Sequence, residues 1–206
     1  MRLLHYYHVY QADGWERIVN EHINALESSG LFEFVQQVRL GVVGDDADLA
    51  LDMFLSRGIR ASLVAKADDG WEQVTLKALY DGLEDDTLIL YAHTKGVANP
   101  SALNDAWRQS MTDQLVGNWQ NCVRLLEVRG CEAVGCHWLT PEALSWANVK
   151  SPYFAGNFWW AKSELLRRCG EPLTETRYEA EAWLGLGEPK LVADRAPGWP
   201  GFDTFR

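Results

Sequence analysis

The 206-residue sequence lacks the short signatures of several enzyme classes. It contains no glycine-rich phosphate loop, no HExxH zinc motif and no arrangement typical of a Ser-His-Asp triad. Its four cysteines form no CxxC pair, and none has a histidine at the spacing of a zinc site. We therefore expect all four cysteines to be reduced core thiols of a cytoplasmic protein.

The sequence also lacks an excess of positive charge and any long apolar run. Its formal net charge is −10, which argues against a protein that holds a nucleic-acid backbone, because such binding needs a basic face. No apolar run approaches the length of a membrane span, and residues 1–10 are too polar for a signal peptide. We expect a soluble protein with no membrane segment.

What the chain does have is enough length for one domain and many tryptophans. Hydrophobic residues make up 47% of the sequence and charged residues 23%, as in ordinary globular proteins. The ten tryptophans are unusual. Any single one is most simply core filling, but those in polar surroundings indicate, as a set, a cleft lined by aromatic rings. That set is Trp15, Trp71, Trp107, Trp138, Trp146 and Trp199.

Strand-like and helix-like segments alternate along the chain, which is typical of an α/β sheet. The patterns predict strands at 3–10, 35–43, 59–65, 88–92, 131–138 and 154–161. They predict helices at 13–29, 49–56, 71–83, 102–128, 163–169 and 177–184. Residues 195–206 are expected to form an extended tail or lid, and residues 140–150 a loop with one helical turn. We therefore predict one domain over residues 1–206, with a mixed, mostly parallel sheet flanked by helices.

Ligands of such sheets bind beyond the carboxyl ends of the strands. This rule selects residues 8–10, 44–48, 65–68 and 93–96. The last of these, His93-Thr94-Lys95-Gly96, follows a strand with an unbroken apolar pattern. Lys95 suits a phosphate group, and Gly96 would let the backbone approach it. The alternative is a simple turn with a solvated lysine. Arg108 could add a second phosphate contact, although a lone helical arginine more often forms a surface ion pair.

Two acidic pairs could carry chemistry. Asp46-Ala47-Asp48 could hold a divalent metal, but it precedes a helix, so helix capping is the favoured interpretation. Glu179 and Glu181 lie two residues apart and do not share a helix face. We expect only one of them to point into the cleft, where it could act as a general base; on spacing alone, a solvated helix face is favoured.

An aromatic segment, residues 151–162, surrounds Gly156 and Asn157. Its aromatic content is that of a buried strand, yet a glycine permits close approach and the asparagine amide carries donors and acceptors. One interpretation is a buried central strand whose Asn157 hydrogen-bonds a neighbouring loop. The other is the floor of a ligand pocket, with Trp159 or Trp160 as a flat wall.

Together, several segments resemble a group of glycosyltransferase-like proteins of bacteria and bacterial viruses, distantly related to rhamnan-synthesis enzymes of the GT-A type. The segments are Tyr6-Tyr-His-Val-Tyr10, His93-Thr-Lys-Gly96, Phe154-Ala-Gly-Asn-Phe-Trp-Trp-Ala161 and Tyr178-Glu-Ala-Glu-Ala-Trp183. The resemblance spans nearly the whole chain. It implies a GT-A-like fold with a nucleotide-sugar donor, foremost a UDP-sugar, over the first half of the sheet.

The resemblance also implies roles for individual residues. GT-A enzymes usually bind a metal through an Asp-x-Asp where this chain has His93-Thr94-Lys95, so we expect no obligatory metal and a diphosphate neutralised by Lys95 with Arg108 or His93. The expected catalytic residues are Glu181, Glu179 and His93. The expected donor contacts are Lys95, Thr94, Arg108, Tyr10, His8 and Trp15. The expected acceptor or sugar contacts are Asn157, Gly156, Trp159 and Trp138.

The predicted function is transfer of a sugar from a nucleoside-diphosphate sugar to a hydroxyl acceptor. The acceptor could be a saccharide, a small molecule or a modified nucleobase; the charge of −10 counts against DNA, but a local basic groove is compatible with that total. The alternative is a non-catalytic carbohydrate- or nucleotide-binding module that kept the fold and lost the chemistry.

Overall fold

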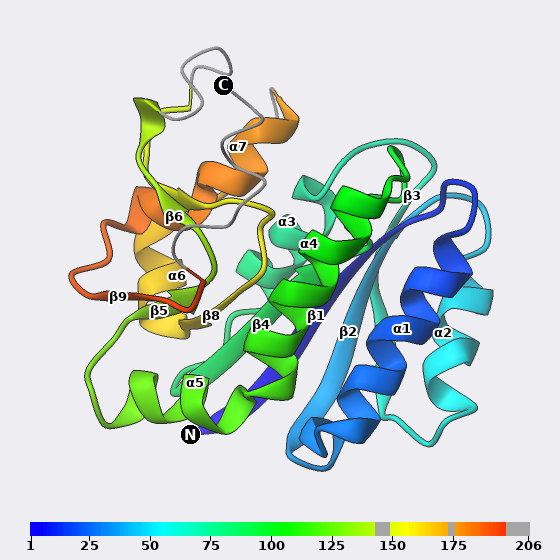
Figure 1. Ribbon diagram of the computed structural model, residues 1–206, viewed down its shortest axis with the longest axis horizontal. Helices are drawn as coiled ribbons and strands as arrows, with labels where there is room; N and C mark the ends of the chain where they lie inside the picture. The colour runs from blue at the N-terminus through cyan, green and yellow to red at the C-terminus, as the bar shows by residue number, and fades with distance from the viewer. Residues whose placement is uncertain (143–148, 173–175, 197–206) are drawn as a thin grey trace.

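The computed structural model describes residues 1–142, 149–172 and 176–196, and it is built around a seven-stranded sheet (Figure 1). The strand order is β3-β2-β1-β4-β8-β5-β9. The strands are β1 (Arg2–Tyr10), β2 (Val35–Val43), β3 (Ala61–Ala67), β4 (Thr87–His93), β5 (Ala133–Gly135), β8 (Trp159–Lys162) and β9 (Val192–Asp194). Strands β1 to β4 pair in parallel, whereas β8 runs antiparallel to both β4 and β5. The predicted mixed, mostly parallel sheet is confirmed.

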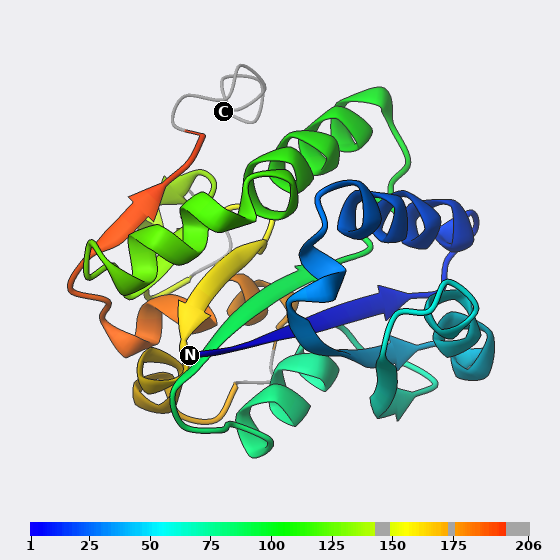
Figure 2. The ribbon, with the colours of Figure 1, turned by 90° about the horizontal axis from the view of Figure 1, so that it is seen from below.

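Helices cover both faces of this sheet (Figure 2). One face carries α1 (Trp15–Ser28), α2 (Ala47–Leu55), α4 (Ala102–Thr112) and α5 (Trp119–Glu127). The other carries α3 (Gln73–Asp81), α6 (Ser163–Cys169) and α7 (Arg177–Ala182). Short 3₁₀ turns follow α1, at Leu31–Glu33, and α7, at Trp183–Gly187.

The two-residue period of the strands explains why both faces have a core. In β1, Tyr7 and Val9 pack under α1, whereas Leu4 and Tyr6 pack on the face of α3. Strand β4 lies near the middle of the sheet and is buried along its whole length. Its unbroken apolar pattern therefore reflects burial on both faces, as predicted.

The predicted helix at 102–128 is interrupted. Helix α4 ends at Thr112, a π turn spans Asp113–Gly117, and α5 begins at Trp119. The apolar side chains of this region recur every four residues, which is more than the 3.6 residues of an α-helical turn. The wider π turn takes up the difference. It leaves Trp107, Met111, Leu115 and Trp119 all buried.

Both predicted strands of the second half are shorter than expected. The predicted strand at 131–138 reduces to β5, because His137 has a φ of 58°, and the predicted strand at 154–161 is split by Gly156 (φ 86°) and Asn157 (φ 54°). Left-handed residues cannot continue a strand. The flanking residues form a second, two-stranded sheet of β6 (Trp138–Leu139) and β7 (Tyr153–Phe154).

Other expectations have mixed outcomes. Strand β9 was not predicted, since its three residues are too few to show a pattern. All four cysteines are buried and free, as expected. Most of the predicted helical turn at 140–150 and of the tail at 195–206, with Trp146 and Trp199, lies outside the described residues. Within the described residues, no helix combines the length and apolar character needed to cross a bilayer.

Candidate functional site

A pocket of about 130 Å³ lies at the carboxyl ends of β1 and β4, where the sheet rule places a ligand. Its lining combines the ends of β1 and β4, the two residues before α3, the loop after β4, one side chain of α4 and one of α7. These residues are His8, Tyr10, Trp71, Glu72, His93, Thr94, Lys95, Gly96, Val97, Ala98, Asn99, Asn104 and Glu181. Residues 44–48 and 65–68, which the same rule selected, do not line it.

The loop after β4 is fixed by Thr94 and presents Lys95. The amide of Tyr10 donates to Thr94 Oγ1 at 2.9 Å, and the Thr94 amide donates to the His8 carbonyl at 3.0 Å. Lys95 Nζ lies 4.3 Å from the centre of the Trp107 ring, within the range of a cation–π contact. Gly96 has a φ of 87°, and a Cβ there would come within 2.9 Å of the Asn104 side chain. Thr94 thus holds the loop, and Lys95 provides the charge.

His93 is held by the Gly156 carbonyl. His93 Nε2 lies 2.9 Å from Gly156 O, and because a carbonyl only accepts, Nε2 carries the proton. Burial, together with the charge of Lys95, lowers the pKa of His93 to about 3, so the ring is neutral at neutral pH. At neutral pH His93 therefore adds no positive charge beside Lys95.

Glu72, which immediately precedes α3, is a pocket residue that the sequence analysis missed. Its Oε1 lies 3.5 Å from His93 Nδ1, and its Oε2 accepts a hydrogen bond from Asn157 Nδ2 at 2.5 Å. The range that the sheet rule selected after β3, residues 65–68, ends four residues before Glu72. Extending it to the start of the next helix would have included Glu72.

Asn157 is 1% exposed and uses its amide inside the protein. Besides Glu72, its Nδ2 donates to the Ala180 carbonyl at 3.3 Å, and its Oδ1 accepts from Trp159 Nε1 at 2.8 Å. The first interpretation of this segment, an asparagine bonded to neighbouring elements, describes it better than a pocket floor. Gly156 has a φ of 86°, which favours glycine, and a Cβ there would also lie 2.8 Å from Met111 Sδ.

Of the two α7 carboxylates, Glu181 lines the pocket. Its Oε2 lies 3.4 Å from the Gly156 amide, which donates to it. Glu179 instead accepts from the Thr176 amide at 2.8 Å and completes a capping box at the start of α7. The two residues face different surroundings, as their spacing predicted.

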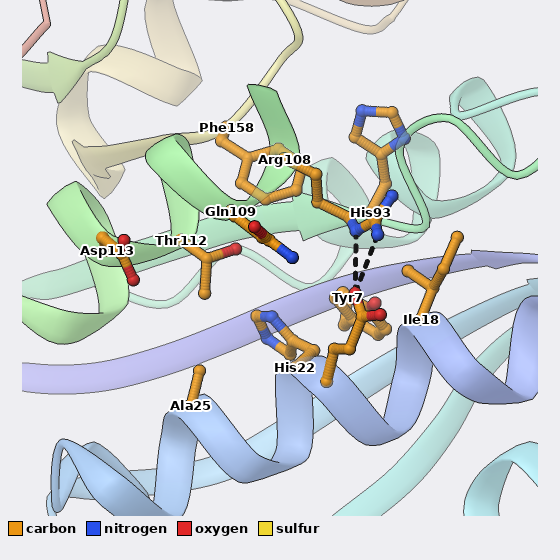
Figure 3. Close-up of a pocket in the computed structure, with 11 residues that line it drawn as sticks. Tyr7, Ile18, His22, Ala25, His93, Arg108, Gln109, Thr112, Asp113 and Phe158 are labelled. Atoms are coloured by element: carbon orange, nitrogen blue, oxygen red, sulfur yellow. Dashed lines mark hydrogen bonds and ion pairs between the residues drawn. The ribbon is translucent and has the colours of Figure 1, made fainter. Parts of the chain in front are cut away.

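Arg108 lies outside the pocket. Its Nη2 is 2.7 Å from both Glu21 Oε2 and Asp105 Oδ1, and its Nη1 donates to the Lys95 carbonyl at 2.8 Å. The guanidinium borders a separate cavity of about 140 Å³ between α1 and α4 (Figure 3). In this arrangement two carboxylates neutralise Arg108 and the residue supports the Lys95 loop from outside the pocket, so the expected diphosphate contact stays a prediction.

Of the ring-bearing residues expected at the donor site, Tyr10 and His8 line the pocket and Trp15 does not. Tyr10 stacks on Trp71 at the rim of the pocket, with ring centres 6.1 Å apart, and Trp71 is 46% exposed. Trp15 is 7% exposed and belongs to the core, so it does not reach the pocket. His8 lines the pocket but is bonded through Nδ1 to Thr75 Oγ1 at 2.7 Å.

The tryptophans of the second half also pack internally. Trp159 is 1% exposed and stacks on Tyr91 at 5.1 Å, while Trp160 donates to the Leu115 carbonyl at 2.8 Å. Trp138 packs on Phe154 with ring centres 4.7 Å apart. None of the three lines the pocket, and the tyrosine and tryptophan that do line it are Tyr10 and Trp71.

Residues 6–185 match the family model described as Domain of unknown function (DUF8361). The chain belongs to the DUF8361 family. No curated protein matches its sequence.

Solved structures establish the fold of this DUF8361 protein. Glucosyl-3-phosphoglycerate synthase from Mycobacterium tuberculosis, in complex with Mn²⁺, UDP and glucosyl-3-phosphoglycerate, is 13% identical; the match has a TM-score of 0.52 and covers 94% of this chain and 70% of that chain. The 4-diphosphocytidyl-2C-methyl-D-erythritol synthase from Anaerococcus prevotii DSM 20548 is 10% identical, with a TM-score of 0.51 over 95% and 90% of the two chains. The GT-A-like fold is thus confirmed, whereas a relation to rhamnan-synthesis proteins stays a prediction.

The described residues do not fit a metal of the kind seen with the first of these structures. Among them, no group of three or more His, Cys, Asp or Glu side chains is placed to hold one ion. Asp46 caps α2, because its carboxylate accepts from the Leu49 amide at 3.1 Å, as the favoured interpretation predicted. Within the pocket, Glu72 Oε2 accepts a hydrogen bond from Asn157 Nδ2.

Proposed function

We propose that this DUF8361 protein is a glycosyltransferase that moves a sugar from a nucleoside-diphosphate sugar to a hydroxyl acceptor. The observation that carries the proposal is that Lys95 and Glu181 line one pocket at the carboxyl edge of a GT-A-like sheet. A cation and a carboxylate in one pocket are the two groups that such a transfer needs, one for the leaving diphosphate and one for the acceptor proton.

In the reaction, the bond between the anomeric carbon and the diphosphate oxygen breaks while the acceptor oxygen bonds to that carbon. Glu181 takes the proton of the acceptor hydroxyl, and the nucleoside diphosphate leaves with the electron pair of the broken bond. Lys95 stabilises the charge that develops on the diphosphate. Tyr10 and Trp71 provide a stacking surface for the base at the rim. UDP-sugars are the donors we would test first, and no step requires a metal.

A second candidate function, a binding module without catalysis, is favoured by the charge of the pocket. Among the described residues that line it, Lys95 is the single lysine or arginine, against the two carboxylates Glu72 and Glu181. One cation compensates a diphosphate only in part. This alternative predicts nucleotide-sugar binding with neither transfer nor slow hydrolysis of the donor.

Binding is tested by thermal unfolding with nucleoside diphosphates and their sugars, each with manganese and with a chelator. A ligand at a hundred times its dissociation constant adds about 2.7 kcal/mol of stability. We expect one nucleotide family to raise the midpoint equally with and without chelator, and Lys95→Met to abolish that rise. Lys190→Met, at an exposed lysine outside the pocket, is the matched control. Stabilisation that needs manganese would contradict the metal-independent reaction.

Catalysis is tested by following release of the nucleoside diphosphate from the donor, with and without hydroxyl acceptors. Removing a general base typically costs about 10²- to 10⁴-fold, so Glu181→Gln should lose activity to that extent while it still binds nucleotide. Glu179→Gln should retain activity, because Glu179 caps a helix. Donor binding without turnover by the unmodified protein would establish the binding module instead.

A further inference from the structure

The Glu72 carboxylate joins two elements of the pocket that come from different halves of the chain. It precedes α3 in the first half, its side chain is 20% exposed, and its Oε2 accepts from Asn157 Nδ2 at 2.5 Å. Its Oε1 lies 3.5 Å from Nδ1 of His93, at the end of β4. Glu72 thus contacts both the Gly156–Asn157 turn and the histidine that this turn holds.

This turn needs such an anchor. Both Gly156 and Asn157 have left-handed backbone angles, and a non-glycine residue in that region costs about 1 kcal/mol or more. Asparagine tolerates the region better than most residues, and its amide can repay the cost through hydrogen bonds. The bond to a carboxylate is the strongest kind available to that amide, because it is charge-assisted.

Through a single residue, Gly156, this turn also holds two side chains of the pocket, Glu181 and His93. The Gly156 amide donates to Glu181 Oε2, and the Gly156 carbonyl accepts from His93 Nε2. A shift of this turn would therefore move the proposed base and the histidine together. Displacements of about 1 Å can cost on the order of 100-fold in rate.

We infer that Glu72 is the positioning residue of this site: it fixes the Asn157 amide and thereby the Gly156 peptide groups that orient Glu181 and His93. The effect on turnover rests on the proposed function, whereas the anchoring of Asn157 does not. Glu72 acts through Asn157, so its role differs from the proton transfer assigned to Glu181.

The chemistry of the contact separates two roles for Glu72: anchoring Asn157 through a hydrogen bond, or acting through its negative charge. A glutamine at position 72 could accept from Asn157 through its oxygen and donate to His93 Nδ1 through its nitrogen, since that ring nitrogen is an acceptor when Nε2 carries the proton. Glu72→Gln should therefore preserve the geometry, and Glu72→Ala should not. Glu164→Ala, at an exposed residue of α6, is the matched control.

The experiment has two readouts, one of them independent of activity. NMR follows the side-chain amide protons of Asn157, which we expect to exchange slowly with water in the unmodified protein and in Glu72→Gln, and at least 10-fold faster in Glu72→Ala. For turnover, we expect Glu72→Ala to lower kcat on the order of 100-fold, with the donor KM within about twofold, and Glu72→Gln to recover most of kcat. Glu164→Ala should change neither.

Three results would overturn the inference: Asn157 exchange unchanged in Glu72→Ala, a kcat unchanged in that variant, or a Glu72→Gln variant as impaired as Glu72→Ala. If Glu72→Ala does not fold, Asn157→Ala removes the same bond from its other end and should lower kcat equally. An unmodified protein with no turnover would refute the proposed function alone, since the exchange readout would still report the anchor.

Discussion

The two halves of the molecule are built differently, and the pocket lies where they meet. Strands β1 to β4 have seven to nine residues each and are all parallel, whereas the strands after residue 130 have two to four residues. The first half supplies Lys95, His93 and Glu72. The second supplies Glu181 and the Gly156–Asn157 turn. A regular sheet thus provides a fixed edge, and short irregular segments bring a carboxylate to it.

Four of the five histidines are buried in the first half, which predicts the largest effect; burial also lowers the pKa of the fifth, His137 of the second half. Burial lowers the pKa of His5 to about 4, those of His8 and His93 to about 3, and that of His22 well below its ordinary value. All four residues belong to the first half. The unfolded chain takes up protons as the pH falls below about 6.5, but the native protein does not until the pH approaches those lower values. The stability that these neutral histidines contribute is therefore fully present above about pH 6.5 and is lost as the pH falls toward 4.

Each such histidine contributes about 1.4 kcal/mol per pH unit to the slope of the free energy of unfolding against pH, so four together give about 5.5 kcal/mol per pH unit. Because small proteins are typically stable by about 5–15 kcal/mol, we expect unfolding near pH 5. Urea titrations between pH 7.5 and 5 measure the slope. Replacing His22 with glutamine should reduce it by about 1.4 kcal/mol per pH unit. A free energy of unfolding that stays constant over this range would contradict the account.

A close backbone contact in the second half gives the next largest effect. A Cβ on Gly185, in the 3₁₀ turn after α7, would lie 1.9 Å from the Pro152 carbonyl oxygen. Backbone must move to relieve that contact, so Gly185→Ala should cost about 3 kcal/mol, measured as the shift in urea midpoint. Gly117→Ala is the matched control, because a Cβ there meets nothing within 4 Å. Equal stability of the two variants would show that the second half is loosely packed.

The same contrast explains what the sequence could predict. In the first half, each strand is long enough to show its pattern, and the predicted bounds of β2, 35–43, are those of the structure. In the second half, three-residue strands show no pattern, and the left-handed angles of His137 and Asn157 arise from bonds to distant residues. The His137 amide, for example, donates to Asp194 at 2.8 Å.

For the candidate site too, residues placed by local patterns were predictable and residues placed by distant contacts were not. The turn at Lys95 was predictable, because it directly follows a buried strand. Glu72 was missed, since its role depends on Asn157, 85 residues away along the chain. Arg108 does not line the pocket, and nothing local indicates its pairing with Glu21, 87 residues earlier.

Helix caps give the smallest effect, and they should affect the two halves alike. Asp46 caps α2 in the first half, and Glu179 belongs to the capping box of α7 in the second. We expect Asp46→Ala and Glu179→Ala each to lower the free energy of unfolding by about 1 kcal/mol, with nucleotide binding unchanged in both. A loss of binding in Asp46→Ala would show a donor or metal contact at that position, and a loss of activity in Glu179→Ala would reopen its catalytic role.

The donor site is tested most directly by a crystal structure of the protein with bound UDP. We expect the diphosphate between the carboxyl ends of β1 and β4, with an oxygen at about 3 Å from Lys95 Nζ and Glu181 facing the open side of the same pocket. UDP bound elsewhere, such as in the cavity beside Arg108, would contradict the assignment of the site. The absence of UDP from crystals grown at saturating concentration would contradict the donor itself.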